Sequence, residues 1–451
     1  MIDRAIRLLA VIASCGAAIP ALGQPATGVA PFNGAPAIHH LASPLAKPVI
    51  EAEPIDASLG ALTLRSAMDA GLAQNRDVQI ARAALTAAKG VLVNAGKRPN
   101  PTLTVGAGPG LIGRYQPRDA DVLINVSQLI ERGNKRELRS EVASLAADAA
   151  QLDIEDTFRQ LRLALANAYF ALKQAQDFVS LAQATRNAFA RSREAAELRL
   201  KAGDIARVDL IRLRVEEGRS ENELLQAHTD LAVAQVMLAT LLAREHDASS
   251  IRVIDPWPVP GDSMLKSDRI EALMDRRPDI SAAIARVHSL EAAFGLAKAQ
   301  RIRDVNVAVI AERNLPANGG TTLGVQLSMP LFINNDYMGD IVRAEADLTS
   351  AKINLEKLRT NVRSDVDRAL AQFESARQQL LRFETQMLPD ALSAAQAAEF
   401  AYKKGGIPLT DLLDARRQLY ATQRELLESR RDFANARARL ESSLIDTDFQ
   451  W

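Results

Sequence analysis

The residue types most suited to catalysis or metal binding are scarce in this chain, which has one cysteine and five histidines in 451 residues. Three histidines stand alone, at His228, His246 and His288, and His39-His40 lies in a proline-rich stretch without further ligands nearby. No Gly-x-Ser-x-Gly, no His-Glu-x-x-His and no phosphate-binding glycine loop with its lysine is present. We therefore expect no enzyme activity, no cofactor and no metal site.

A second group of polar residues follows two glycine-containing turns. Asp209 comes after Gly203, and Asp411 and Asp414 come after Gly405. A helix that starts after such a turn leaves free backbone N–H groups, so a carboxylate in its first turn stabilises it by about 0.3 to 1 kcal/mol. Helix capping is thus one interpretation of Asp209 and Asp411.

The two turns belong to a tandem duplication. Residues 61–246 resemble residues 267–451, and a proline-rich linker, residues 247–266, joins them. Lys201-Ala202-Gly203-Asp204-Ile205, for example, recurs as Lys403-Lys404-Gly405-Gly406-Ile407, about 202 residues later. A solenoid would repeat every 20 to 50 residues or so. The chain therefore consists of two large, similar repeats.

Long amphipathic helices dominate each repeat, because apolar residues recur in alternating steps of three and four, as in a coiled coil. In the second repeat this seam comprises Leu348, Ala351, Leu355, Leu358, Val362, Val366, Ala369, Phe373, Ala376, Leu380, Phe383 and Met387. Each helix of roughly 65 residues would span on the order of 100 Å. A glycine turn ends it, and a second helix returns, over residues 208–244 or 409–444. Pro389 should kink or break the second rod.

Residues between the first two helices of each repeat predict β-hairpins with about ten residues per strand. The strands are expected around residues 102–105, 122–127, 305–309 and 323–327. About ten residues can cross a bilayer in a tilted barrel, and no run of 18 apolar residues follows the N-terminal segment. Four strands cannot close a barrel, so the chain would have to pool strands with copies of itself. The alternative is a small soluble sheet.

The N-terminus has the features of an export signal over residues 1–23, with Arg4 and Arg7 before an apolar run. Cleavage near Gly23 is one expectation. The other is lipidation of Cys15, which ends the lipobox-like Ile12-Ala13-Ser14-Cys15. Residues 24–60 form a Pro/Ala-rich leader. Since 55 basic residues balance 55 acidic ones, nucleic acid is not an expected partner.

The order of helix, hairpin and long helical hairpin, repeated in tandem, resembles the TolC-type outer-membrane efflux factors. Within them, residues 127–136 (SQLIERGNKR) are most similar to the CzcC heavy-metal efflux branch. The resemblance implies a mainly α fold with a β-barrel part. A homotrimer would pool four transmembrane strands per chain into a twelve-stranded barrel in outer-membrane lipid, and its helices into a hollow periplasmic α-barrel.

The function implied is passive conduction of heavy-metal cations, driven by an inner-membrane resistance-nodulation-division pump and joined by a periplasmic adaptor, a membrane fusion protein. A duct for drug efflux or type I protein secretion remains open, because cargo choice lies mostly in the pump. A periplasmic coiled-coil scaffold is the alternative of another class. It shares the long helices but leaves the paired hairpins without an explanation.

The resemblance also implies a periplasmic gate. Asp209 and Tyr402 match residues that hold the closed state by hydrogen bonds across neighbouring coils, and Asp411 and Asp414 match acidic rings that favour cations. Where the best-known family member has an arginine, this chain has Ile407, so the closing network differs. The hairpin tips would contact the adaptor, and they comprise Gly203, Asp204, Ile205, Gly405, Gly406 and Ile407.

Overall fold

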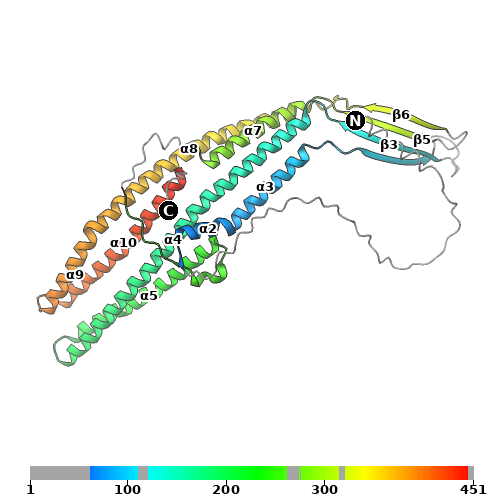
Figure 1. Ribbon diagram of the computed structural model, residues 1–451. Helices are drawn as coiled ribbons and strands as arrows, with labels where there is room; N and C mark the ends of the chain where they lie inside the picture. The colour runs from blue at the N-terminus through cyan, green and yellow to red at the C-terminus, as the bar shows by residue number, and fades with distance from the viewer. Residues whose placement is uncertain (1–60, 110–119, 262–273, 275, 314–319, 445–451) are drawn as a thin grey trace, which may run out of the picture. The chain divides into compact units, whose positions relative to one another are not determined.

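The computed structural model describes residues 61–109, 120–261, 274, 276–313 and 320–444, drawn in colour in Figure 1. All of them lie in one compact unit, Pro54–Trp451. The expected signal peptide, the leader and Cys15 lie outside the described residues.

The described part of the first repeat contains the α-helices α2 (Leu64–Gln74), α3 (Arg76–Ala95), α4 (Lys135–Lys201) and α5 (Arg207–Leu241). Thr63 and Asn75 cap α2 and α3, because their side chains accept hydrogen bonds from free backbone N–H groups. With 67 residues, α4 confirms the long-helix prediction. It packs against both α3 and α5 (Figure 1).

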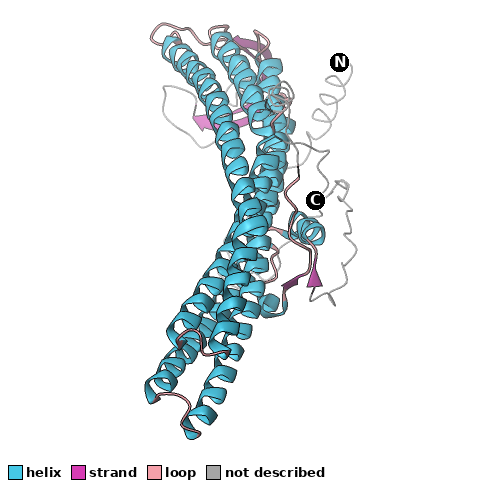
Figure 2. Ribbon diagram, turned by 90° about the vertical axis from the view of Figure 1, so that its left-hand side faces the viewer, coloured by secondary structure: helices cyan, strands magenta, loops and turns pink. Residues whose placement is uncertain are grey.

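The second repeat contains α7 (Pro278–Ala299), α8 (Met338–Arg382), α9 (Leu388–Lys403) and α10 (Leu409–Leu444). Helix α7 packs against both α4 and α8, and α10 packs against α4, α8 and α9, so helices of the two repeats share one assembly. Figure 2 shows the long helices running side by side. The predicted seam is confirmed along most of its length, with Val362, Val366, Ala369, Ala376 and Leu380 buried. Alanine and valine at these positions allow close helix approach.

A π-helical turn, η2 (Phe383–Met387), separates α8 from α9, and Pro389 follows as the second residue of α9. The chain does not break at Pro389, and the departure from regular α-helix lies just before it, at η2. The predicted seam step from Phe383 to Met387 is wrong. Met387 is 36% exposed, whereas Leu388 packs beside Phe383 in a buried cluster. The π turn lengthens the seam step from four residues to five.

The π turn holds one residue that the first repeat lacks. The equivalent seam residues Ala182 and Phe383 are 201 positions apart, whereas the tip glycines Gly203 and Gly405 are 202 positions apart. The extra residue therefore lies between the seam and the tip of the second repeat, where η2 is found. A π turn accommodates one inserted residue without changing the direction in which later side chains point.

Four strands form one antiparallel sheet in the order β2 (Thr102–Pro109), β3 (Ala120–Ile130), β5 (Val305–Arg313) and β6 (Thr321–Ser328). Both predicted hairpins are confirmed, with strands of 8 to 11 residues. Pairing of β3 with β5 joins the two repeats. Among the described helices, no stretch combines the length and the apolar character of a membrane span.

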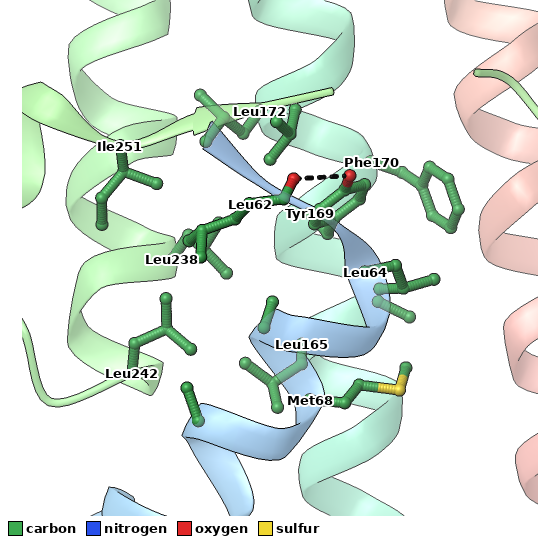
Figure 3. Close-up of a cluster of buried hydrophobic side chains, with 14 of the residues drawn as sticks. Leu62, Leu64, Met68, Leu165, Tyr169, Phe170, Leu172, Leu238, Leu242 and Ile251 are labelled. Carbon is green, nitrogen blue, oxygen red and sulfur yellow. Dashed lines mark hydrogen bonds between the residues drawn. The ribbon is translucent and has the colours of Figure 1, made fainter. Parts of the chain in front are cut away.

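The largest buried cluster surrounds the middle of α4 and includes Leu165, Tyr169 and Leu172 (Figure 3). Two short strands, β1 (Ala61–Leu62) and β4 (Arg252–Val253), pair beside it, next to the 3-10 helix η1 (Glu245–Ser250). Val259 of the linker is exposed. Ile251 and Val253, near the start of the linker, are buried in the cluster.

Asp255 ties the linker to the helices. Its Oδ2 accepts hydrogen bonds from the Leu64 N–H at 2.6 Å and the Tyr169 hydroxyl at 2.9 Å. The same hydroxyl lies 3.0 Å from the Leu62 carbonyl oxygen, the bond dashed in Figure 3. Burial raises the pKa of Tyr169 above its ordinary value. Trp257 stacks on Phe170 with ring centroids 6.0 Å apart.

Candidate functional site at the hairpin tips

The two helical hairpins, α4 with α5 and α9 with α10, end in matching turns. Gly203 and Gly405 have φ angles of 81° and 77°, a left-handed conformation that costs glycine little. The Asp204 N–H donates to the Arg199 carbonyl at 2.9 Å, and the Gly406 N–H donates to the Ala401 carbonyl at 2.8 Å. These bonds close each helix in a Schellman motif, so the predicted glycine caps are confirmed.

Four of the six expected adaptor-docking residues are exposed, namely Gly203, Asp204, Gly405 and Gly406. Ile205 and Ile407 are half-buried instead. Ile205 packs on a buried cluster, here called the tip cluster, to which both hairpins contribute. The tip cluster comprises Phe189, Ala196, Leu210, Leu213, Leu409, Leu412 and Leu413. The glycine turns are therefore exposed to solvent, and the buried tip cluster supports them from below.

The aspartates predicted for the gate lie just behind these turns. Asp209 and Asp411 occupy the first turns of α5 and α10, at equivalent places in the two repeats. The Asp209 side chain is 25% exposed, and its Oδ1 lies 3.4 Å from a guanidinium nitrogen of Arg212. Asp411 is exposed and accepts a hydrogen bond from the Thr410 hydroxyl at 3.2 Å. Both positions fit the helix-dipole role as well as a gate.

Tyr402 lies at the end of α9 and packs against the tip cluster. Its hydroxyl accepts a hydrogen bond from Arg199 of α4 at 3.3 Å, and the Arg199 guanidinium carbon lies 5.7 Å from the ring centroid. Within one chain, Tyr402 thus contacts Arg199, while Asp209 contacts Arg212. The expected bonds of Asp209 and Tyr402 across neighbouring coils remain a prediction.

A set of charged residues connects the two hairpins behind the tips, and of its four members the sequence analysis had singled out only Asp414. Arg417 of α10 donates to Glu216 of α5 from Nη2 at 2.6 Å and from Nε at 3.2 Å. It also donates to Asp414 at 2.8 Å, and Arg219 donates to Glu216 at 3.2 Å. We call these four residues the cross-hairpin network. The bond to Glu216 raises the pKa of Arg417 above its ordinary value.

The position of Glu216 in the helical pattern could have identified it as a residue that needs a charged partner. Its side chain is 8% exposed, and it stands on the buried face of α5 between Leu213 and Ser220, in steps of three and four. A carboxylate at such a position must find a partner, because an unpaired buried charge is costly. Arg417 gave no comparable signal, since its side chain is half-exposed.

The stretch of residues 127–136 forms the joint between β3 and α4. Gly133 has a φ of 72°, and a Cβ atom there would lie 2.6 Å from the Ile302 side chain. The buried Lys135 donates to the Ile302 carbonyl at 2.7 Å and to Asp304 at 2.9 Å. Arg139 donates to both oxygens of Glu131, at 2.6 and 3.1 Å. These residues fix how the sheet meets the long helix.

Known proteins are similar to this chain in sequence and in fold. The chain is 26% identical over 367 residues to the cobalt-zinc-cadmium resistance protein CzcC of Cupriavidus metallidurans, covering 80% of this chain and 84% of that protein. It is 26% identical over 348 residues to the outer membrane protein TolC of Vibrio cholerae, covering 70% and 75%. A solved structure of CusC matches with a TM-score of 0.72 at 20% identity, covering 84% of this chain and 91% of that one.

The family model described as outer membrane efflux protein matches residues 68–244 and 270–444. These ranges fall in the two repeats and together make up most of the chain. The chain belongs to the outer membrane efflux protein family.

Proposed function

We propose that this protein is the passive outer-membrane duct of a tripartite pump that exports heavy-metal cations. The family is one of outer-membrane efflux proteins, and CzcC, a relative that covers 80% of the chain, carries cobalt-zinc-cadmium resistance in its name. The role is transport without catalysis. An inner-membrane resistance-nodulation-division pump would supply the energy, and a periplasmic adaptor would join pump and duct.

The main structural support for a membrane-spanning duct is that one face of the sheet is apolar and exposed. Leu103, Val126, Val309 and Val325 lie opposite one another on neighbouring strands, and all four are between 36% and 76% exposed. In the next row on this face, Val105 pairs with Ile124, and Ala311 pairs with Leu323. A wide, exposed apolar face is costly in water and stable in lipid.

The opposite face of the sheet is more polar. One of its rows joins Thr102, Ser127, Ala308 and Gln326. A transmembrane barrel places its apolar face toward lipid and its polar face toward the lumen. Strands β2 and β6 form the edges of the sheet within one chain, and edges pair readily with another chain. Three chains joined edge to edge give a homotrimer with a twelve-stranded barrel.

The helical hairpins extend into the periplasm and narrow at a gate. Asp411 and Asp414 would each occur three times around the entrance, and such carboxylate rings favour cations. Asp414 is already paired with Arg417, so Asp411 supplies most of the free negative charge. Asp209 and Tyr402 close the gate across neighbouring coils, and the exposed glycine turns receive the adaptor.

The N-terminal assignments belong to the same proposal. Residues 1–23 direct export, residues 24–60 form a leader, and the repeats occupy residues 61–246 and 267–451 around the linker at 247–266. The mass of the mature N-terminus separates the two processing routes. A diacylated Cys15 would exclude cleavage near Gly23, and a chain that starts at Gln24 would exclude lipidation.

Metal tolerance of a deletion strain tests the proposed cargo. We expect loss of the gene to lower the inhibitory concentrations of cobalt, zinc or cadmium salts, and a plasmid copy to restore them. Drugs, dyes and secreted proteins are measured in parallel. A strain that keeps its metal tolerance but loses drug tolerance or a secreted protein would contradict metal export and favour the corresponding duct. Recovery of the wild-type protein from the soluble periplasmic fraction would favour the scaffold.

A further inference from the structure

A cavity of about 680 Å³ lies between the two helical hairpins, directly behind the tips. Helix α4 lines one side with residues such as Ser192, and α9 and α10 line the other with residues such as Glu399 and Arg416. We call it the inter-hairpin cavity. Its volume falls within the roughly 300 to 1,000 Å³ that is typical of sites for small organic ligands.

The floor of the inter-hairpin cavity is apolar. Phe189, Leu213, Leu412 and Leu413 line it, and all four are buried members of the tip cluster. Their packing against both hairpins gives the floor a fixed shape. An aromatic ring or a short alkyl chain placed there would leave water for an apolar surface, which favours binding.

The polar lining carries excess positive charge. Four cations, Arg191, Arg199, Lys403 and Arg416, face a single carboxylate, Glu399, among the charged residues that line the cavity. Glu399 is already engaged, because Lys403 lies 3.0 Å from one of its oxygens and Arg416 lies 3.8 Å from the other. The hydrogen bond from Lys403 holds the pKa of Glu399 below its ordinary value. One carboxylate thus leaves most of the cationic charge unneutralised.

Two of these guanidinium groups are held in place. Arg416 donates to the Ser192 hydroxyl at 2.8 Å, and Arg199 donates to the Tyr402 hydroxyl at 3.3 Å. Each of these bonds joins α4 to the second hairpin. Neutral hydroxyls orient an arginine without cancelling its charge, and a planar guanidinium binds carboxylate, sulfonate or phosphate oxygens in pairs.

We propose that the inter-hairpin cavity binds an amphipathic organic anion, in which an aromatic or short alkyl group carries one sulfonate, carboxylate or phosphate. The apolar part lies on the tip-cluster floor, and the anionic group lies against Arg416 and Arg199. The ligand bridges α4 of one hairpin to α9 and α10 of the other, at a site distinct from the Asp411 and Asp414 carboxylates.

Binding has a consequence for conduction, and this part rests on the proposed duct. Because the ligand contacts both hairpins, it stabilises their present separation. A duct that opens when the hairpins move apart would therefore open less often with the ligand bound. Binding itself does not depend on conduction, so the two parts can be measured separately.

The binding test uses naphthalene-2-sulfonate, titrated calorimetrically into the full-length protein in a non-ionic detergent, with detergent alone as the blank. We expect one saturable site per chain. Arg416→Gln should weaken binding about tenfold, in line with the loss of one charge-assisted hydrogen bond. The cation (2-naphthylmethyl)trimethylammonium, with the same ring system, should bind at least tenfold more weakly than the sulfonate.

A matched pair of variants locates the site. Ala195 lines the cavity, whereas Ala397, its equivalent 202 residues later, is likewise exposed and is not among the lining residues. We expect Ala195→Trp to fill the cavity and lower the affinity at least tenfold, and Ala397→Trp to bind as the wild type does. Equal affinities in both variants, equal binding of the cationic probe or no saturable binding at all would overturn the proposal.

Conductance measured with the same probe separates the two parts. Saturable binding that leaves the wild-type conductance unchanged would keep the site and refute its effect on opening. Saturable binding by a protein that never conducts would keep the site and refute the duct.

Discussion

Arg417 in α10 and Glu216 in α5 stand 201 positions apart in the sequence, yet they form two hydrogen bonds of 2.6 and 3.2 Å. Glu216 is almost fully buried, while Arg417 is 48% exposed. Discounted for solvent screening on the exposed side, such a pair stabilises the contact by about 1 kcal/mol. It lies between the two hairpins whose separation would open the duct.

We expect Glu216→Gln to raise the open probability of single channels about fivefold, because about 1 kcal/mol of closing free energy is lost. Planar-bilayer recordings measure this. Glu217→Gln is the matched control, since Glu217 pairs with Arg193 inside the first hairpin at 2.6 Å. The swap of Glu216→Arg with Arg417→Glu should recover part of the closed state. Equal open probabilities in the Glu216→Gln and Glu217→Gln variants would show that the Glu216–Arg417 pair does not stabilise the closed state.

Asp411 and Asp414 of α10 should contribute unequally to cation preference. Asp411→Ala is expected to reduce cation preference more than Asp414→Ala, because Arg417 already offsets the Asp414 charge. The double variant should also conduct more than the wild type. Reversal potentials in a salt gradient report the preference, and step sizes report the conductance. An unchanged conductance and preference in the double variant would remove both residues from the gate.

Tyr169 anchors the linker to the helical core. Tyr169→Phe removes the hydroxyl that contacts Leu62 and Asp255 and should destabilise the fold by about 1 to 3 kcal/mol, because buried partners lose a hydrogen bond. Thermal unfolding followed by circular dichroism measures the loss. Tyr402→Phe, which loses one 3.3 Å bond to an exposed arginine, should melt within a degree or two of the wild type. Equal melting of both variants would contradict the anchoring role.

The π turn predicts where the second rod tolerates a deletion. Removal of Gln386 should convert η2 into regular α-helix and leave α9 in register, because the first repeat already has one residue fewer over this stretch. Removal of Gln378, in the regular part of α8, should shift the buried seam instead. Yield and thermal stability of folded protein compare them. A Gln386 deletion as damaging as the Gln378 deletion would show that η2 does not absorb an inserted residue.

The repeats, long helices, glycine turns and hairpins could be predicted because each depends on local periodicity or on one residue type. Gly203 and Gly405, for example, follow amphipathic runs and adopt the positive φ that ends a helix. The seam step at Met387 failed, because a π turn arises from competition between two seam registers, which periodicity alone does not resolve.

Contacts between residues far apart in the chain could not be predicted from the sequence. The register of Val126 opposite Val309 depends on how the two repeats meet. Glu216 interrupts an apolar seam, which indicates a buried carboxylate that needs a cationic partner. Nothing in the sequence distinguishes Arg417, the actual partner, from the many solvent-exposed arginines. Ile251 and Val253 are short apolar positions in a polar, proline-rich context, and only the assembled helices show that both are buried. Local sequence patterns therefore predict neither the Glu216–Arg417 pair nor the burial of Ile251 and Val253.

The most direct test of the duct is to measure the assembly state and the conductance of one detergent-extracted preparation. Native mass spectrometry should give three chains per particle, and planar bilayers should show small, cation-selective current steps. A monomer that stays in solution without detergent and never conducts would contradict the account, because the apolar face around Val126 would then not lie in lipid.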